Sequence, residues 1–168
     1  MAGSGAESLE AFFEAVTLGD HATARAMIAA DPALARAADE MGFTALHVLG
    51  TEDDPAMAEL LLAAGADVNA RNDMGMTPLH IAQHASLVEV FVKHGADVNA
   101  RAQHDWTPLH VQAGESEDSG ASEAIAALLA AGADPNLRDA TGETPLAIAL
   151  EREEEEKIAL LRAHGATE

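Results

Sequence analysis

The segment Thr77-Pro78-Leu79-His80 decides the fold, because the chain repeats it with small changes along its length. A second phrase, Gly95-Ala96-Asp97-Val98-Asn99-Ala100, follows it. A two-part unit with a period of about 33 residues is typical of elongated stacks in which each unit contacts only its neighbours. Further copies of the first phrase are Thr44-Ala45-Leu46-His47, Thr107-Pro108-Leu109-His110 and Thr144-Pro145-Leu146-Ala147, and the second phrase begins again at Gly65, Gly132 and, shortened, at Gly165.

The composition supports one folded domain over residues 1–168. Hydrophobic residues make up 48% of the chain, which is too many for a disordered tail. Most of them are Ala and Leu, and aromatic residues are only 3%, so we expect closely packed small helices. The absence of cysteine excludes disulfides and thiolate metal sites. A composition rich in Ala, Arg and Glu and poor in Lys favours a bacterial source with a GC-rich genome.

The charge of the chain narrows the choice of partner. The net charge is −20, from 9 basic and 29 acidic residues, which disfavours binding to nucleic acid and to anionic membranes. It favours a basic partner, although the same charge also keeps an extended stack soluble. The first ten residues lack the features of a signal peptide, and no stretch reaches the ~18 apolar residues of a membrane span. We therefore expect a soluble cytoplasmic monomer.

Each unit predicts two helices and a polar turn. Thr is a good N-cap, the following Pro suits the first helical position, and Gly suits the position just after a helix. The first helix is expected to run for two turns, as over 79–84, and the second as over 58–64. The polar stretch 69–75 predicts a finger that resembles a β-hairpin. The acidic run 151–157 predicts a solvated terminal helix.

This alternation of finger, helix, loop and helix resembles the ankyrin repeat family, whose signature is T-P-L-H-x-A. The resemblance covers about 39–166 by both phrases, and 16–34 is similar to a first repeat without a finger. It implies an all-α solenoid that recognises another protein through fingertips and a concave face, with no cofactor and no catalysis. The expected units, of which the first and last are caps, are 7–38, 39–72, 73–102, 103–139 and 140–168.

Two units depart from the common length. The distances from Thr to the next Gly of the second phrase are 21, 18, 25 and 21 residues. Unit 73–102 has therefore lost three residues, and its first helix is expected to be cut short near Ala85-Ser86. Unit 103–139 has gained four, in the acidic segment 114–120. Insertions in solenoids often lie on the binding face, so this segment is a candidate site, and the alternative is a tolerated surface loop. Its acidic candidates are Glu115, Glu117 and Asp118.

The main candidates for partner contact lie in the fingers, one residue and three residues before each Thr of the first phrase. Among ankyrin proteins these positions tend to face the ligand, and Met and Trp are enriched in the cores of interfaces. The alternative is that each fingertip only packs on its neighbour. The candidates are Met41, Phe43, Met74, Met76, His104, Asp105 and Trp106.

Two further finger positions stand out. Asp105 replaces the Gly that the family usually has in the turn, so this finger is expected to be specialised or strained. Arg71, Arg101 and Arg138 recur six residues after the Gly of the second phrase. A ladder at repeat spacing is more often structural than functional. The expected partners are neighbouring carbonyls or the carboxylates of Asp67, Asp97 and Asp134.

The histidines and glutamines leave two alternatives open. The resemblance implies that His47, His80 and His110 join adjacent units through hydrogen bonds. His80 and His84, four apart on one expected helix, suit a metal with His104 and Asp105, but no H-E-x-x-H occurs and no metal is predicted. One alternative function is an inhibitor or immunity protein for a basic enzyme. The other is a small-molecule binder or enzyme whose pocket is lined by Gln83, His84 and Gln112, with Trp106 beside them.

Overall fold

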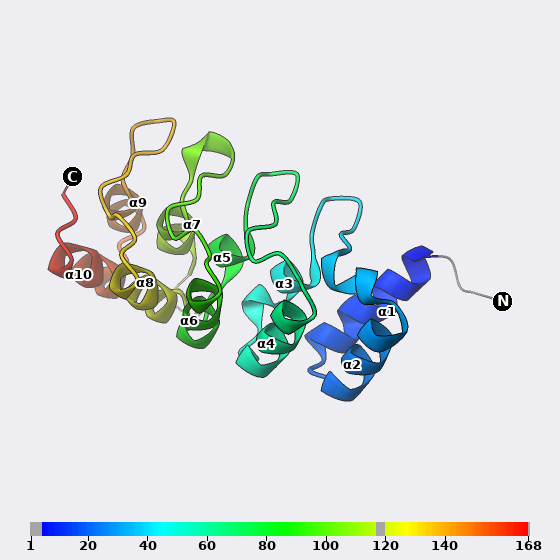
Figure 1. Ribbon diagram of the computed structural model, residues 1–168. Helices are drawn as coiled ribbons and strands as arrows, with labels where there is room; N and C mark the ends of the chain where they lie inside the picture. Colours follow the sequence, from blue (N-terminus) through cyan, green and yellow to red (C-terminus); the bar gives the residue numbers. More distant parts are fainter. Residues whose placement is uncertain (1–4, 117–119, 168) are drawn as a thin grey trace.

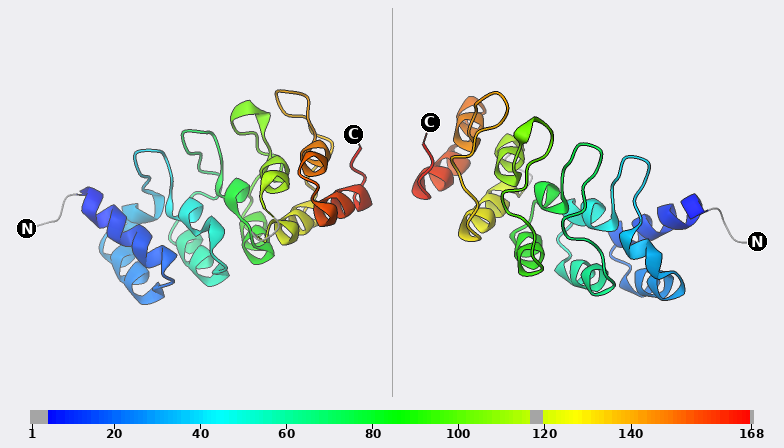
Figure 2. Two further views of the ribbon diagram at one scale, coloured as in Figure 1. Left: turned by 180° about the vertical axis from the view of Figure 1, so that it is seen from behind. Right: turned by 45° about the horizontal axis from the view of Figure 1, so that its top comes forward.

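The computed structural model describes residues 5–116 and 120–167. Within these residues, ten α-helices form five pairs that stand in a single row, and loops project from one side of that row (Figure 1). The two ends of the chain lie at opposite ends of the row (Figure 2). The described residues contain no strand, and one isolated bridge joins Ala38 to Thr44. The predicted all-α stack is confirmed.

Each pair has a first and a second helix. The first helices are α1 (Gly5–Thr17), α3 (Ala45–Val48), α5 (Pro78–Ile81), α7 (Pro108–Gly114) and α9 (Pro145–Glu151). The second helices are α2 (His21–Ala30), α4 (Pro55–Ala63), α6 (Ala85–Lys93), α8 (Ala121–Ala130) and α10 (Glu155–Ala163). Short 3₁₀ helices are η1 (Pro32–Arg36), η2 (Leu49–Thr51) and η3 (Gln103–Asp105).

The core runs along the whole stack as one continuous cluster. Each of the four units that carry the first phrase contributes its Leu, which is fully buried or nearly so, because the helix begins one residue earlier and turns that side chain inward. Consecutive first helices pack on one another, and so do the second helices from α4 to α10. Burial of each such Leu stabilises the fold by about 2 kcal/mol. The signature leucines are Leu46, Leu79, Leu109 and Leu146.

The short unit differs from the sequence-based expectation. Helix α5 ends at Ile81 after one turn, so the helix expected over 79–84 was wrong. The chain is extended at Ala82, and the N–H of Gln83 donates to the carbonyl of Gly50 in the preceding unit (3.0 Å). Ala85 and Ser86 already belong to α6, so the break falls earlier than predicted. This contact with the neighbouring unit holds the chain in its extended path, and local sequence does not reveal it.

The last unit also differs from expectation. The acidic run 151–157 is not one helix, because α9 ends at Glu151 and α10 begins at Glu155. Lys157 is fully buried, and its ammonium donates to the carbonyl of Glu115 in the preceding unit. A buried lysine needs such partners, because an unpaired buried charge is strongly destabilising. The segment is therefore part of the packing between the last two units rather than a purely solvated helix.

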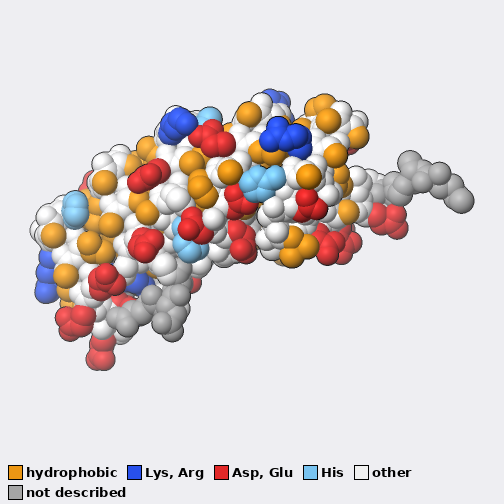
Figure 3. All heavy atoms as spheres, turned by 90° about the horizontal axis from the view of Figure 1, so that it is seen from below, with side chains coloured by type: hydrophobic (Ala, Val, Ile, Leu, Met, Phe, Trp, Pro, Cys, Tyr) orange, Lys and Arg blue, Asp and Glu red, His pale blue; other side chains and the backbone are white. Residues whose placement is uncertain are grey.

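The face opposite the fingers is mixed in character. Seen from that side, acidic side chains are scattered among hydrophobic ones, with a few basic groups (Figure 3). A membrane-crossing helix would have to be longer and more apolar than any helix within 5–116 and 120–167.

Candidate functional site

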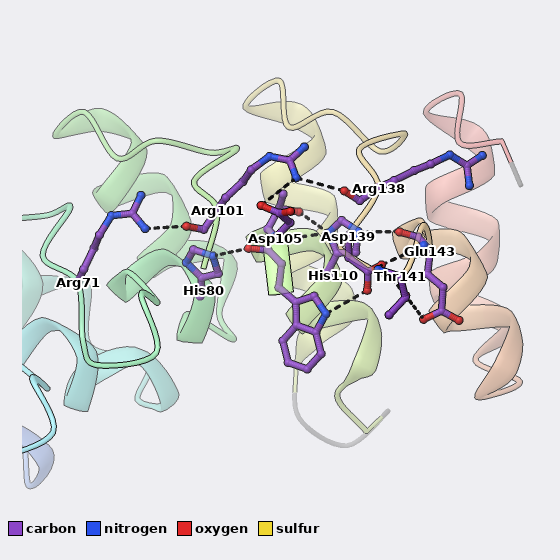
Figure 4. A network of polar contacts seen from close by, with 11 residues as sticks. Arg71, His80, Arg101, Asp105, His110, Arg138, Asp139, Thr141 and Glu143 are labelled. Atoms are coloured by element: carbon purple, nitrogen blue, oxygen red, sulfur yellow. Dashed lines mark hydrogen bonds and ion pairs between the residues drawn. The ribbon is translucent and has the colours of Figure 1, made fainter. Parts of the chain in front are cut away.

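Histidines at the third position of three first helices hold the fingers in place. The N–H of Thr77 donates to Nδ1 of His80 (3.0 Å), and the hydroxyl of Thr77 lies 3.0 Å from the same nitrogen. Because Nδ1 accepts from a backbone N–H, the ring proton is on Nε2. Nε2 then donates to the carbonyl of Trp106 in the next finger (3.1 Å) (Figure 4). His47 and His110 repeat this arrangement with the carbonyls of Met76 and Glu143.

Burial keeps these histidines neutral. Removal from water lowers the pKa of His80 to about 4, and the pKa values of His47 and His110 shift in the same direction. The geometry also favours the neutral form, because a proton added to Nδ1 would point at the backbone N–H from which Nδ1 accepts a hydrogen bond. The interaction between units that the resemblance implied is therefore present at all three histidines.

In three of the four fingers, the first residue carries a carboxylate or an amide that fixes the turn. Oδ1 of Asn72 accepts the N–H groups of Met74 and Met76, both at 3.0 Å. Asp39 and Asp139 accept the corresponding pairs of N–H groups in their own fingers. Such side chains mimic a backbone turn and stabilise it. Gly75 follows with a positive φ of 73°, as Gly42 and Gly142 do in their fingers.

The finger at 102–106 has neither the side-chain acceptor at its first residue nor the glycine in its turn. Ala102 stands where the others have Asp or Asn, and Asp105 stands where they have Gly. Both His104 (φ 60°) and Asp105 (φ 58°) are left-handed, and the turn is the 3₁₀ helix η3. Left-handed geometry costs a non-glycine residue about 1–2 kcal/mol. The carboxylate of Asp105 lies 3.6 Å from the guanidinium of Arg101 in the same finger.

Backbone bonds join the fingers into one row. An N–H of each later finger donates to a carbonyl of the finger before it, over 2.8–3.0 Å: Asp73 to Met41, Gln103 to Met74 and Ala140 to His104. Arg71 adds a bond to the carbonyl of Arg101 (2.7 Å), and Arg101 adds one to that of Arg138 (3.2 Å), as Figure 4 shows. The structure thus gives these arginines the carbonyl partners expected of a structural ladder. The carboxylates of Asp67, Asp97 and Asp134 instead accept the N–H two residues on.

Exposed hydrophobic side chains gather on the fingers. Met41 is 61% exposed, Met74 45% and Trp106 41%, and the fourth large one among the described residues is Leu18 (74%), outside the fingers. Phe43 and Met76 are half-buried, and the ring of Phe43 packs edge-on against His47 (5.6 Å between centroids). His104 is exposed, and its ring lies 5.9 Å from that of Trp106. We call Met41, Met74, His104, Asp105 and Trp106 the fingertip surface.

Trp106 is held by the next finger. Its indole N–H donates to Oδ2 of Asp139 (3.1 Å). Burial by itself raises the pKa of Asp139, but hydrogen bonds from Thr141, from the N–H of Glu143 and from Trp106 outweigh it and lower that pKa to about 2. Asp139 is therefore a carboxylate at any ordinary pH, and the indole ring has a fixed acceptor.

The ring of Trp106 also lines an open cleft of about 370 Å³. One wall comes from the end of α7, with Val111 and Glu115, and the other comes from the end of α9. The cleft lies between α7 and α9, directly beside the fingertip surface. The remaining lining residues are His110, Gly114, Asp139, Glu143, Ile148, Glu151 and Arg152.

The other predicted site residues are distributed as follows. Glu115 lies in the cleft with Trp106, whereas Glu117 and Asp118 lie outside the described residues. Gln112 is fully buried, and its amide donates to the carbonyl of His80 (2.8 Å). Gln83 and His84 are half-buried, and the other end of the inserted segment, Gly120, packs against them. None of these three lines the cleft at Trp106, so a pocket at them stays a prediction.

The metal hypothesis placed His80 and His84 on one helix, and this was wrong. His80 lies in α5, while His84 precedes α6, with extended backbone between the helices. Within residues 5–116 and 120–167, no three His, Asp or Glu side chains come together in a way that suits a metal ion.

The sequence reasoning missed the far wall of the cleft. Ile148, Glu151 and Arg152 belong to the next unit, and only stacking brings them to Trp106. An alignment of the four fingers shows that position 102 lacks the Asp or Asn of the others. This departure lies in the same finger as Asp105.

The molecule is a row of stacked helix pairs with projecting fingers, and neutral histidines in the capping boxes of the first helices join adjacent units. These features define a repeat protein of the solenoid class. A family model of ankyrin repeats, in three copies, matches residues 51–139, and the chain therefore belongs to the ankyrin repeat family. No curated protein matches the chain significantly. Ankyrin repeats are generally protein–protein interaction modules, and proteins built from them are typically non-enzymatic.

Proposed function

We propose that this chain binds another protein through the fingertip surface and the neighbouring first helices. The observation that carries the proposal is the concentration of exposed hydrophobic side chains on three fingers of an otherwise strongly acidic molecule. Exposed apolar patches with a polar rim are typical of interaction sites. The row of bonds between fingers supports the proposal, because a rigid surface loses little conformational entropy on binding.

The partner is expected to be basic. At a net charge of −20, the chain attracts a cationic protein over a distance of about 10 Å at moderate salt. Inhibition of a basic enzyme is one form that such binding takes. In that case, association slows steeply as salt is added, whereas the dissociation rate changes little.

Affinity capture from cells of the source organism tests the proposal. The immobilised wild type is compared with a triple variant, Met41→Ser, Met74→Ser and Trp106→Ala. Leu18→Ser is the matched control, because Leu18 is equally hydrophobic, more exposed and outside the fingers. We expect a protein retained by the wild type and the control and lost from the triple variant. A protein retained equally by all three would contradict the fingertip site.

A further inference from the structure

We propose that the cleft beside Trp106 receives an arginine side chain of the partner. This inference rests on the proposed protein-binding function and deepens it by naming the chemistry of the bound residue. Three features of the cleft carry it: a fixed aromatic ring, carboxylates from two units, and a volume of about 370 Å³. That volume is near the lower end of the range of about 300–1,000 Å³ for ligand pockets, which fits one long side chain.

The aromatic ring supplies the first part of the recognition. The N–H of Trp106 is already donated to Asp139, so its exposed surface is carbon and π-electron density. A cation over an indole face is attracted by its quadrupole, by about 0.5–2 kcal/mol depending on desolvation. A planar guanidinium stacks on such a face better than a compact ammonium does. The hydrogen bond to Asp139 holds the ring in place before the ligand arrives.

Carboxylates supply the second part. Glu115, Glu143 and Glu151 line the cleft from two adjacent units. The hydroxyl of Thr141 donates its one proton to Asp139 (2.7 Å), so Oε2 of Glu143, 3.3 Å from that hydroxyl, stays available to a ligand. Arg152 is the one Lys or Arg in the lining, and among the described residues it forms no ion pair with these carboxylates. The cleft therefore has negative charge in excess and room for a guanidinium to be bound by two oxygens.

The hydrophobic lining suits the rest of an arginine side chain. Val111 and Ile148 come from facing helices and line the cleft. Three methylene groups pack on such surface while the charged head reaches the carboxylates. Trp106 belongs to both the fingertip surface and the cleft, so a partner on the fingers is correctly placed to insert one residue here.

Fluorescence gives a direct test, because Trp106 is the one tryptophan of the chain. The probes are three blocked tripeptides, acetyl-Gly-X-Gly-amide, in which X is arginine, its neutral isostere citrulline, or lysine. We expect saturable quenching by the arginine peptide at about millimolar concentration in low salt. The citrulline peptide should bind at least about tenfold more weakly, and the lysine peptide about threefold more weakly.

Two double variants separate the cleft from the general charge. Glu143→Gln with Glu151→Gln removes two carboxylates of the cleft, and Glu14→Gln with Glu89→Gln removes two exposed ones elsewhere, so both have a net charge of −18. We expect the first to weaken arginine binding about tenfold and the second to leave it nearly unchanged. Thermal unfolding followed by circular dichroism verifies that both fold.

The outcomes are distinct. No saturable response to the arginine peptide, equal binding of citrulline, or equal weakening in both double variants would overturn the cationic site. Lysine binding as tight as arginine binding would overturn the assignment to arginine. If the peptides fail while the captured protein is still lost from the triple variant, the cleft proposal falls and the fingertip proposal stands.

Discussion

The fingers at 72–76 and 102–106 share three backbone bonds but hold their turns differently, and the second adds a bond from the N–H of Trp106 to the carbonyl of Gln103 (3.4 Å). In the first, Asn72 accepts two N–H groups and Gly75 takes the positive φ. In the second, Ala102 accepts nothing through its side chain, and both His104 and Asp105 are left-handed. Both fingers accept a bond from a histidine of the preceding first helix, Met76 from His47 and Trp106 from His80. The regular finger adds a side-chain acceptor of its own, whereas the irregular one adds the bond from Trp106 to Asp139 in the next finger.

The largest effect is expected from cutting the link between these two fingers. His80→Ala removes the donor to the Trp106 carbonyl and the acceptor of the Thr77 N–H, and it leaves a cavity in a fully buried position. We expect a loss of about 3–4 kcal/mol in the free energy of unfolding. Urea denaturation measures it. A loss under about 1 kcal/mol would show that the irregular finger is held by other contacts.

Acid should weaken the same link. The unfolded His80 has a pKa near 6.5 and the folded one about 4, so the unfolded state binds a proton more readily in between. The stabilisation is complete above about pH 6.5 and is lost as the pH falls towards 4, by at most about 3 kcal/mol. His47 and His110 act in the same direction. Urea denaturation between pH 7 and 4 should show this decline, and constant stability over that range would contradict it.

A smaller effect is expected from making the regular finger like the irregular one. Asn72→Ala leaves the N–H groups of Met74 and Met76 without their acceptor and should cost about 1–2 kcal/mol. Asn72→Asp is the control, because Asp39 and Asp139 perform the same role in their fingers. It should keep the wild-type stability to within about 0.5 kcal/mol. Thermal unfolding of the two variants side by side decides the matter.

The smallest effect comes from exchanging the turn residues. Asp105→Gly relieves a left-handed Asp (φ 58°) and should stabilise the fold by about 0.5–1 kcal/mol, although it gives up the weak, exposed pairing with Arg101. Gly75→Asp should destabilise by a similar amount. Both are read from the midpoint of urea denaturation. If Asp105→Gly destabilises, the contact with Arg101 is worth more than the strain.

Sequence alone predicted the repeats because their signals are local. A Thr before Leu, a Pro at the first helical position and a Gly after the second helix each act within a few residues. The exact end of α5 was missed because the extended path after it is held by a bond from Gln83 to Gly50 of another unit. The cleft was missed for the same reason, since Trp106, Glu143 and Glu151 come from a finger, the next finger and a later helix. The aligned fingers did identify Asp105 as unusual, although Ala102 was overlooked.

The bonds between neighbouring fingers have a consequence for how mutations combine. Each finger is bonded to the one before it, from Met41 to Asp73 and on to His104 and Ala140. Perturbations therefore pass only between adjacent units and fade along the stack. Substitutions in the first and last fingers should add independently, whereas substitutions at 72 and 102 should show coupling. The first finger, at 39–43, can then change in sequence without altering the cleft at Trp106.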